Sequence, residues 1–464
     1  MIVPRSFGPR SIGLAAAAIV GIAPVAPVPV AAHVAAAVAP ASVTQPVDPA
    51  PTGEPVPPSP PLVRVAPPRG LQPGPAVGLR AAARCTPPRA DAPGVPSDAG
   101  SPAARLRLAE VQQLATGRDQ VIAVIDTGIG PHPLFGSRLR GGGDYLTGGD
   151  GLDDCDGHGT AVAGLLAAAP VRGERSSTPV GIAPQARLLA IRQSSPSFDV
   201  PAPGGGRRPA GDTATLAEAV MLAVRSGADV VNISETVCLP ADRAVTAGAL
   251  LQAALQAAAT ADVVVVAAAG NLGSGGCIAD GRDQVVLPGW FDPDVLTVGA
   301  VGPDDTPAPF TVPGPWVDVA APGTGLRSLA VGGGTTGNLD GTSFATPWVA
   351  GLAALVRERF PELTATEVVD RILATARRAP TGGGALGYGV VDPIAALTAL
   401  PVRLVPDPER LASAAALVAD LPGTRPAADP PRAPDRPLDL LAAAALLAVA
   451  GLTVVVLRRR PRRG

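Results

Sequence analysis

The strongest signal for chemistry lies at residues 341–347, where Ser343 shortly precedes a run of apolar and small residues, 348–356. A helix that is apolar on all sides belongs in the centre of a domain. Its first turn presents unpaired N–H groups and the positive end of its dipole near the Ser343 hydroxyl, which suits a reaction that develops negative charge there. We place Pro347 in that first turn, where its missing N–H is not needed. Considered alone, such a serine is more often a helix N-cap.

His158 is the best placed of the three histidines in the chain. It lies between two glycines, which permit close approach of the backbone, and it opens an apolar helical run at residues 161–168. His132 lies between two prolines in an expected loop and is interpreted as structural, and His33 lies near the N-terminal segment. By itself, a Gly-His-Gly sequence is weak evidence for an active site.

Asp126 directly follows the short apolar run 121–125, which predicts a buried strand with a turn after it. An acid in this position could simply cap the turn. Hydrolysis of a peptide bond, however, needs a nucleophile, a base that takes its proton, and an acid that holds the base in one tautomer. Ser343, His158 and Asp126 have the side chains for these three roles, and we predict that they meet in one site.

Asn271 could supply the remaining group that this chemistry requires. It comes just after the apolar run 263–269, which predicts another buried strand. A negatively charged oxygen develops on the substrate carbonyl during the reaction, and a positioned amide donor stabilises it. We therefore predict that the Asn271 amide points into the same site.

Short apolar strands alternate with amphipathic helices around these residues. The predicted strands are residues 121–125, 187–191, 230–234, 263–269 and 295–300, and the predicted helices are 161–168, 213–225, 247–260 and 365 to about 378. Asp212 is the expected N-cap of the second helix, and Thr364 with Glu367 forms a capping box for the last. This alternation indicates an α/β domain with a mostly parallel sheet and helices on both faces. Active sites in such sheets gather at the carboxyl ends of the strands.

The composition of the chain excludes some functional classes. Its 464 residues carry a formal net charge of −2 and only 3% aromatic residues, which gives no reason to expect nucleic-acid binding. Residues 1–34 combine arginines, a short apolar run and small residues, the pattern of a cleaved secretory signal peptide; an uncleaved anchor is the alternative. Residues 35–104 are rich in proline and alanine, a composition that does not build a core of its own.

The C-terminal end has the pattern of a membrane anchor. Residues 440–457 carry no charge and as a helix span about 27 Å, just enough for a hydrocarbon core. Five arginines follow within residues 458–464, which places that end in the cytoplasm. We therefore predict a transmembrane helix at 438–457, with a buried soluble helix as the weaker alternative. The protein would be a single-pass cell-membrane protein with its main domain outside the cytoplasm.

The chain resembles the subtilisin-like serine proteases over residues 105–400. The resemblance rests on four features: Asp126-Thr127-Gly128, Gly157-His158-Gly159-Thr160, Asn271 and Gly341-Thr342-Ser343. The order Asp, His, Ser along the chain is the order of the subtilisin triad. The resemblance implies a subtilisin-like α/β fold and a serine endopeptidase acting on proteins or peptides. Ala345-Thr346 after Phe344 departs mildly from the usual Ala-Ala, and we expect little effect beyond helix packing.

Within the subtilases, the chain is similar to the mycosins, the membrane-anchored proteases of actinobacterial type VII (ESX) secretion systems. The signal peptide, the single C-terminal helix and the paired cysteines carry this narrower resemblance. It implies association with the type VII secretion membrane complex, and an N-terminal extension that wraps the catalytic domain without blocking it. The expected layout is a signal peptide (1–34), extension (35–104), protease domain (105–400), linker (401–437), transmembrane helix (438–457) and basic tail (458–464). A structural role in the secretion complex, with proteolysis secondary, is the alternative function.

Four cysteines in an exported chain suggest two disulfides, for which three pairings exist. Cys238 and Cys277 each follow a neighbouring strand at the same edge of the expected sheet, so we expect them to pair. That leaves Cys85 with Cys155, which fits an extension tied beside the helix of His158. Free or swapped cysteines are the alternative.

The remaining polar segments give no further site. The acidic residues Asp144, Asp150, Asp153 and Asp154 do not have the spacing of an EF-hand loop, and we interpret them as solvated loop charges. We expect no required metal and no cofactor. The Pro/Gly-rich segments 173–178 and 194–211 are interpreted as disordered surface loops; the alternative is that they narrow the cleft or dock a partner.

Overall fold

The computed structural model of the chain describes residues 59–62, 64–71, 73–81, 85, 90, 101–170, 180–202, 204–278, 284–378 and 383–400. The predicted signal peptide, linker, transmembrane helix, basic tail and loop 173–178 lie outside these residues. Within the described part of the chain, no helix is both long and apolar enough to cross a membrane.

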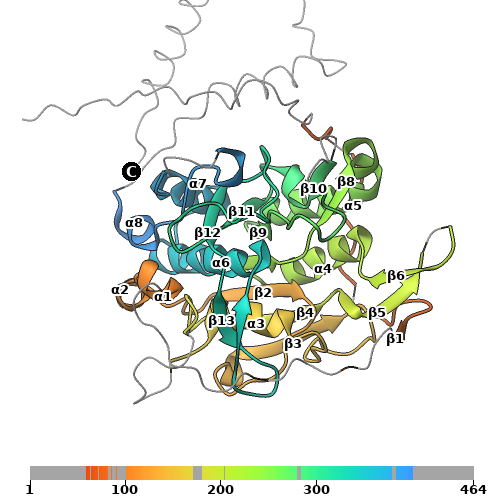
Figure 1. Cartoon of the computed structure of the whole chain (residues 1–464), viewed down its shortest axis with the longest axis horizontal. Helices are drawn as coiled ribbons and strands as arrows, with labels where there is room; N and C mark the ends of the chain where they lie inside the picture. Colours follow the sequence, from red (N-terminus) through yellow and green to blue (C-terminus); the bar gives the residue numbers. More distant parts are fainter. Residues whose placement is uncertain are drawn as a thin grey trace, which may run out of the picture. The chain divides into compact units, whose positions relative to one another are not determined.

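A seven-stranded parallel sheet forms the centre of the fold (Figure 1). Its strands run in the order β12 (Val319–Pro322), β11 (Leu296–Val301), β9 (Val264–Ala268), β7 (Val230–Ile233), β2 (Val121–Asp126), β4 (Arg187–Arg192) and β3 (Leu139–Asp144). Every neighbouring pair is parallel. The predicted parallel sheet is therefore confirmed, and its runs of valine, isoleucine and alanine are typical of strands buried on both faces.

Helices cover both faces of this sheet, and alternate residues of each strand pack into two separate cores. Ile122 and Val124 of β2 belong to the core with α2 (Leu108–Leu114), α3 (His158–Ala167), α6 (Thr342–Arg359), α7 (Ala365–Thr375) and α8 (Pro393–Thr398). Ala123 and Ile125 of the same strand face the core with α4 (Thr213–Arg225) and α5 (Ala241–Thr260). The alternation follows from the two-residue period of a strand.

The predicted elements of the central domain are present, with ends that differ from those in the structure by up to six residues (247 − 241 = 6). Asp212 caps α4 in a capping box, and Thr364 and Glu367 do the same for α7, which ends at Thr375 and not near residue 378. Helix α3 begins at His158 itself, and α5 begins at Ala241, before the predicted residue 247. Two strands of the central sheet were not predicted: β12, and β3, whose sequence Leu-Arg-Gly-Gly-Gly-Asp is typical of a turn.

Residues 195–201 and 207–210 are strands, so the interpretation of segment 194–211 as a disordered surface loop is wrong. Strands β5 (Ser195–Pro201) and β6 (Arg207–Ala210) pair antiparallel, and β1 (Arg80–Ala81) adds to β5. The segment is mostly polar, so its sequence does not indicate that Val200 and Ala210 are buried and pack against Leu146. Two further antiparallel sheets have two strands each: β8 (Val237–Pro240) pairs with β10 (Gln284–Leu287), and β13 (Leu326–Leu329) pairs with β14 (Thr335–Leu339).

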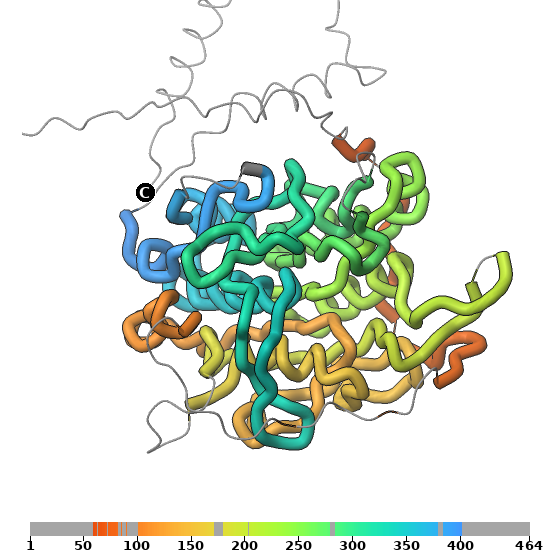
Figure 2. The backbone as a smooth tube through the Cα atoms, viewed as in Figure 1, coloured from red at the N-terminus to blue at the C-terminus, as the bar shows by residue number. Residues whose placement is uncertain are grey.

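The described pieces of the N-terminal extension contact the central domain (Figure 2, red). The backbone N–H of Gly70 donates to Glu218 of α4 at 2.7 Å, and Ala76 N donates to the carbonyl of Leu146 at 2.9 Å. These described pieces have no core of their own, in line with their composition, and gain their contacts from the domain beside them.

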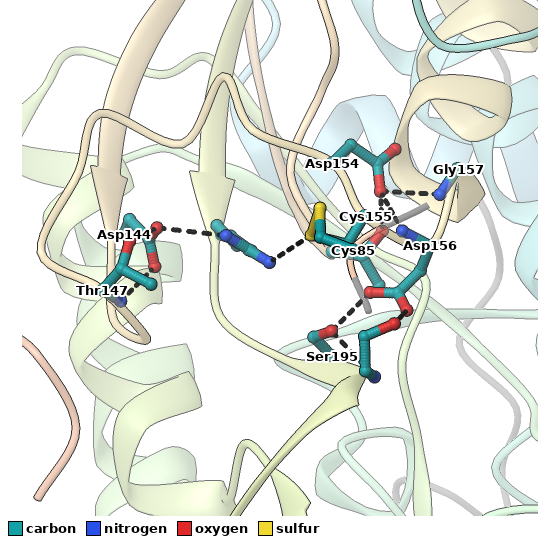
Figure 3. Close-up of a disulfide and its surroundings, with 11 residues drawn as sticks. Cys85, Asp144, Thr147, Asp154, Cys155, Asp156, Gly157 and Ser195 are labelled. Carbon is teal, nitrogen blue, oxygen red and sulfur yellow. Dashed lines mark hydrogen bonds and ion pairs between the residues drawn. A yellow bond between two sulfur atoms is a disulfide. The ribbon is translucent and has the colours of Figure 1, made fainter. Parts of the chain in front are cut away.

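Both expected disulfides are present. Cys85 is bonded to Cys155 with a Cα–Cα distance of 4.8 Å, and Cys238 to Cys277 at 4.9 Å. Figure 3 shows the first bond, which anchors the extension between Asp154 and Asp156, directly before the helix that carries His158.

Two of the four acidic residues interpreted as solvated loop charges are buried. Asp150 and Asp153 are exposed as expected, but Asp144 is only 1% exposed and Asp154 only 3%. Asp144 accepts hydrogen bonds from the backbone N–H groups of residues 146 and 147, and it lies 3.4 Å from the buried guanidinium of Arg192 (Figure 3). The interpretation fails for these two because each carboxylate is satisfied by internal donors and needs no water.

Candidate active site

Asp126, His158 and Ser343 lie in mutual hydrogen-bonding contact. The Nδ1 atom of His158 is 2.7 Å from Asp126 Oδ1, and its Nε2 atom is 2.9 Å from Ser343 Oγ. An ionised carboxylate can only accept a hydrogen bond, so Nδ1 carries the proton and Nε2 is free to accept the Ser343 hydroxyl proton. Asp126 and Ser343 are 217 positions apart in the sequence (343 − 126 = 217), and His158 links their side chains through these two hydrogen bonds.

Strand β2 and helix α3 set the Asp126–His158 contact. Asp126 is the last residue of β2 and is fully buried, and its Oδ1 also accepts from Thr127 N at 2.8 Å. Helix α3 starts so close to the turn after β2 that a Cβ atom on Gly159 would come within 2.0 Å of the Gly128 carbonyl oxygen. The glycines around His158 thus permit close approach, as expected from the sequence.

Asp154 braces the same junction, a role that sequence reasoning missed. Its Oδ1 accepts from Thr127 Oγ1 at 2.9 Å and from Gly157 N at 2.8 Å, and its Oδ2 accepts from Thr160 N at 2.9 Å. One buried carboxylate therefore ties the turn after β2 to the first turn of α3. In the sequence, only the position of Asp154, four residues before His158, indicates this role, and it lies in a segment that was interpreted as a loop.

Asn271 lies against the start of α6, where Ser343 is the second residue of the helix. Thr342 N and Thr342 Oγ1 each lie 3.0 Å from Asn271 Oδ1. A backbone N–H can only donate, so the amide oxygen faces Thr342 and the Nδ2 group faces the other way. A Cβ atom built on Gly341 would lie 2.9 Å from Ser343 Oγ and 3.5 Å from Asn271 Nδ2, so the hydroxyl and the amide border the same small space.

Pro347 does not lie in the first turn of α6, so this expectation is wrong. The helix starts at Thr342, which puts Pro347 at its sixth position, where an ordinary residue would donate to the carbonyl of Ser343. The Ser234 hydroxyl donates to that carbonyl at 3.0 Å, and Asn232 Nδ2 in turn lies 2.8 Å from Ser234 Oγ. Thr346 also does more than pack, because its hydroxyl donates to the Thr342 carbonyl at 2.8 Å.

The electrostatics of the site centre on His158. Burial by itself lowers the pKa of this imidazole, but the charge of Asp126 and its hydrogen bond, with Glu235 and Asp154, raise the pKa to about 9. Burial, and then the charge of Asp126, raise the pKa of Glu235 to about 7. An imidazolium that forms during a reaction would thus be held by an adjacent carboxylate.

The structure brings all four predicted side chains together and keeps the other described histidine apart. His132 makes other contacts, with Nε2 3.1 Å from the Gly334 carbonyl and Nδ1 accepting from Leu134 N at 3.1 Å. These contacts fit the structural role expected for it. Ser234, whose hydroxyl donates to the Ser343 carbonyl, was not identified from the sequence. The sequence does contain an indication, because Pro347 lies four residues after Ser343 and cannot donate to that carbonyl itself.

Comparisons with known proteins identify the family of the chain. The Subtilase family profile matches residues 117–391. Mycosin-3 of Mycobacterium tuberculosis is 39% identical over 437 residues, which cover 85% of this chain and 91% of that protein. The structure of MycP3 protease from the type VII (ESX-3) secretion system is 41% identical and superposes with a TM-score of 0.65, covering 74% of this chain and 100% of that one. A chain in the structure of the periplasmic assembly from the ESX-5 inner membrane complex is 35% identical, with a TM-score of 0.64 over 80% of this chain and 97% of that one.

These relatives and the profile identify both the fold and the class of enzyme. The sheet with helices on both faces is the subtilisin-like α/β fold expected from the motifs. The relatives are matched over most of their own length, so the comparison extends well beyond the motifs. The chain therefore belongs to the subtilase family of serine-type endopeptidases and, within that family, to the mycosins.

Proposed function

We propose that Ser343 is the nucleophile, His158 the general base and acid, Asp126 the group that orients His158, and Asn271 the oxyanion donor. The observation that carries this assignment is the continuous contact from Asp126 through His158 to Ser343, at 2.7 Å and 2.9 Å. Both distances are within hydrogen-bond reach, as a nucleophile and its base require.

The reaction follows from the geometry. The Ser343 hydroxyl attacks the carbonyl carbon of the substrate while His158 Nε2 takes its proton, and Asp126 stabilises the imidazolium that results. The carbonyl oxygen becomes an oxyanion, which accepts hydrogen bonds from Asn271 Nδ2 and from the Ser343 N–H. That N–H lies in the first turn of α6 and has no acceptor within the helix. His158 then protonates the leaving amine, and a water molecule hydrolyses the acyl-enzyme by the same steps in reverse order.

A peptide library tests the activity without knowledge of the natural substrate. The full chain, purified in detergent, is incubated with peptides derived from a proteome, and new termini are identified by mass spectrometry. We expect new termini with the wild-type chain and none with Ser343→Ala. Cleavage that persists in Ser343→Ala would contradict the assignment of the nucleophile.

The cellular setting that we propose is the outer face of the cell membrane. Residues 1–34 direct export, 35–104 wrap the protease domain at 105–400, and 438–457 anchor it through the linker 401–437, leaving 458–464 in the cytoplasm. The charge pattern of the C-terminal residues supports the anchor. The contacts of residues 70 and 76 with the domain, and the Cys85–Cys155 bond, support the wrapped extension. Protection of residues 458–464 from protease in spheroplasts, with the domain accessible, is the expected result.

We also propose that the protein associates with a type VII secretion membrane complex. The support is its similarity to a chain in the periplasmic assembly of the ESX-5 inner membrane complex, at 35% identity. The same similarity favours the alternative, in which the protein stabilises the complex and proteolysis is secondary. Complementation of a deletion strain separates the two. Secretion restored by Ser343→Ala indicates a structural role, and secretion restored only by the wild type indicates that cleavage is needed; co-purification from membranes tests the association itself.

A further inference from the structure

A cavity of about 430 Å³ opens beside the catalytic groups, among residues that the reaction above does not use. Ser194 follows strand β4 and Glu235 follows β7, so the cavity lies at the carboxyl edge of the sheet, where Asp126 ends β2. Its volume is within the range of pockets that bind small ligands or single side chains. Glu235 is also only one residue from Ser234, which holds the Ser343 carbonyl.

The lining of this cavity is mostly aliphatic and carries few charges. Leu216 of α4, Leu239 of β8 and Leu287 of β10 supply apolar walls. Arg208 and Asp212 also border it, but they pair with each other at 2.7 Å, and Arg208 donates to the Gly211 carbonyl as well. These two charges therefore compensate one another locally.

Glu235 is the remaining charged group, and no arginine forms an ion pair with it in the described part of the chain. Its one hydrogen-bond partner among the described residues is the Ser194 hydroxyl, which donates to Oε1. The carboxyl is half-buried, and burial raises its pKa to about 7. A carboxylate in such a setting gains more from a cation than an exposed one does.

A long aliphatic stem with a cationic head matches this combination of walls and charge. Lysine and arginine side chains pack their methylene groups along apolar surfaces and present the charge at the end. We propose that Glu235 gives this protease a preference for peptide substrates that place an arginine or lysine side chain in this cavity. The inference rests on the proposed catalytic function, because the selection takes place beside the same nucleophile.

Peptidyl phosphonates test the preference, since they report binding next to Ser343 and require no turnover. Four series of tetrapeptide diphenyl phosphonates carry lysine or its uncharged isostere norleucine at each position in turn. The measured quantity is the second-order rate constant for modification of Ser343 in the full chain at pH 8, where Glu235 is mostly ionised. At one position we expect the lysine phosphonate to react about 10- to 100-fold faster than the norleucine phosphonate. This factor corresponds to the free energy of a hydrogen bond to a charged group.

Variants at residue 235 assign the preference to its carboxylate. Glu235→Gln should reduce the lysine-to-norleucine ratio to within about threefold, and Glu235→Arg should favour glutamate over glutamine at the same position. Comparing ratios within one variant cancels any effect of residue 235 on His158. Glu110→Gln, which removes an exposed carboxylate paired with Arg107 on α2, is the matched control and should keep the wild-type ratio.

The outcomes separate this inference from the catalytic assignment. A ratio near one at every position, or a ratio that Glu235→Gln leaves unchanged, overturns the preference while simple fluorophosphonate labelling of Ser343 still supports the protease. Loss of labelling by both simple and peptidyl probes in the wild type would contradict the catalytic function itself.

Discussion

The Ser234 hydroxyl donates a hydrogen bond to the backbone carbonyl of Ser343 at 3.0 Å. In an uninterrupted helix, residue 347 would supply this donor, but Pro347 has no N–H. The carbonyl of the nucleophile is thus held by a residue at the end of β7, from outside its own helix. Pro347 removes one backbone hydrogen bond of α6, and the Ser234 hydroxyl at the edge of the sheet replaces it.

Ser234→Ala should lower both activity and stability. The buried Ser343 carbonyl would lose its partner, which costs about 1–3 kcal/mol in the free energy of unfolding. We expect kcat to fall about tenfold, equivalent to about 1.4 kcal/mol in the activation barrier, because the start of α6 would shift. Kinetics and chemical denaturation measure the two effects.

Thr375→Ala is the matched control for this variant. It also deletes a hydroxyl that donates to a helix carbonyl, that of Arg371 at 2.7 Å, but in α7. Its stability should fall slightly and its kcat should stay at the wild-type value. Equal kcat in Ser234→Ala and wild type would show that the Ser234 contact has no bearing on the nucleophile.

Asn271→Ala should slow the chemical step and leave substrate binding nearly unchanged. Removing one oxyanion donor slows subtilisin by about 10²–10³ in kcat, and the Nδ2 group here faces the same small space as Ser343 Oγ. Steady-state kinetics should show this loss in kcat with KM within about threefold of wild type. A change confined to KM would mean that Asn271 contacts the substrate without stabilising the oxyanion.

The pH dependence of activity should report His158. Only the neutral imidazole accepts the Ser343 proton, so kcat/KM of the free enzyme should rise with pH and reach half its maximum near pH 9. The contribution of His158 to stability changes with pH in the opposite direction to activity. Because the folded pKa exceeds the ordinary value of 6.5, the His158–Asp126 pair stabilises the fold below about pH 6.5 and this contribution is lost as the pH rises through about 9.

Asp126→Asn tests the cause of that raised pKa. The variant removes the largest raising effect, so the midpoint of the kcat/KM profile should move to lower pH, and kcat should fall about 10⁴-fold, as in related triads with the wrong tautomer. Glu235→Gln should move the midpoint in the same direction by less, since the charge of Glu235 raises the pKa of His158 by less than that of Asp126 does. A midpoint that Asp126→Asn leaves in place would show that another group titrates.

Gly341→Ala should abolish most activity with the fold retained. The added Cβ would lie 2.9 Å from Ser343 Oγ, closer than a Cβ atom normally approaches an oxygen, and would fill the space that the oxyanion needs. We expect kcat/KM to fall at least about 10²-fold, comparable to the loss of an oxyanion donor. Gly74→Ala, where the added Cβ meets nothing within 4 Å, is the control and should keep wild-type activity.

Replacing both Cys238 and Cys277 with serine should destabilise the domain. The bond closes a loop of sequence separation 39, for which the chain-entropy estimate is up to about 4 kcal/mol in the free energy of unfolding. Chemical denaturation of the double variant under non-reducing conditions measures the loss. A midpoint equal to that of the wild type would indicate that the bond contributes no net stability.

The sequence predicts the central strands well because their apolar runs are unbroken. The run ending at Asp126 and the run before Asn271 each became a strand of the parallel sheet, and the polar residue after each lies in the site. Parallel strands place their carboxyl ends at one edge, so short motifs sufficed to locate the four predicted side chains.

The contacts that brace the site could not be predicted in the same way. Ser234 and the Ser343 carbonyl are separated by 109 residues, and only the folded sheet edge shows which hydroxyl replaces the missing donor. Asp154 lies in a polar segment, and its burial depends on donors from Thr127 and Thr160 that converge only in the fold. Such networks combine residues whose individual patterns indicate ordinary loops.

The most direct test of the account is to locate the site of covalent labelling by a fluorophosphonate. The full chain is labelled in membranes, digested, and the modified residue identified by mass spectrometry, with Ser343→Ala and His158→Ala treated in parallel. The account predicts a single adduct on Ser343, absent in Ser343→Ala and formed far more slowly in His158→Ala. An adduct on another serine, or labelling of Ser343→Ala at the wild-type rate, would contradict it.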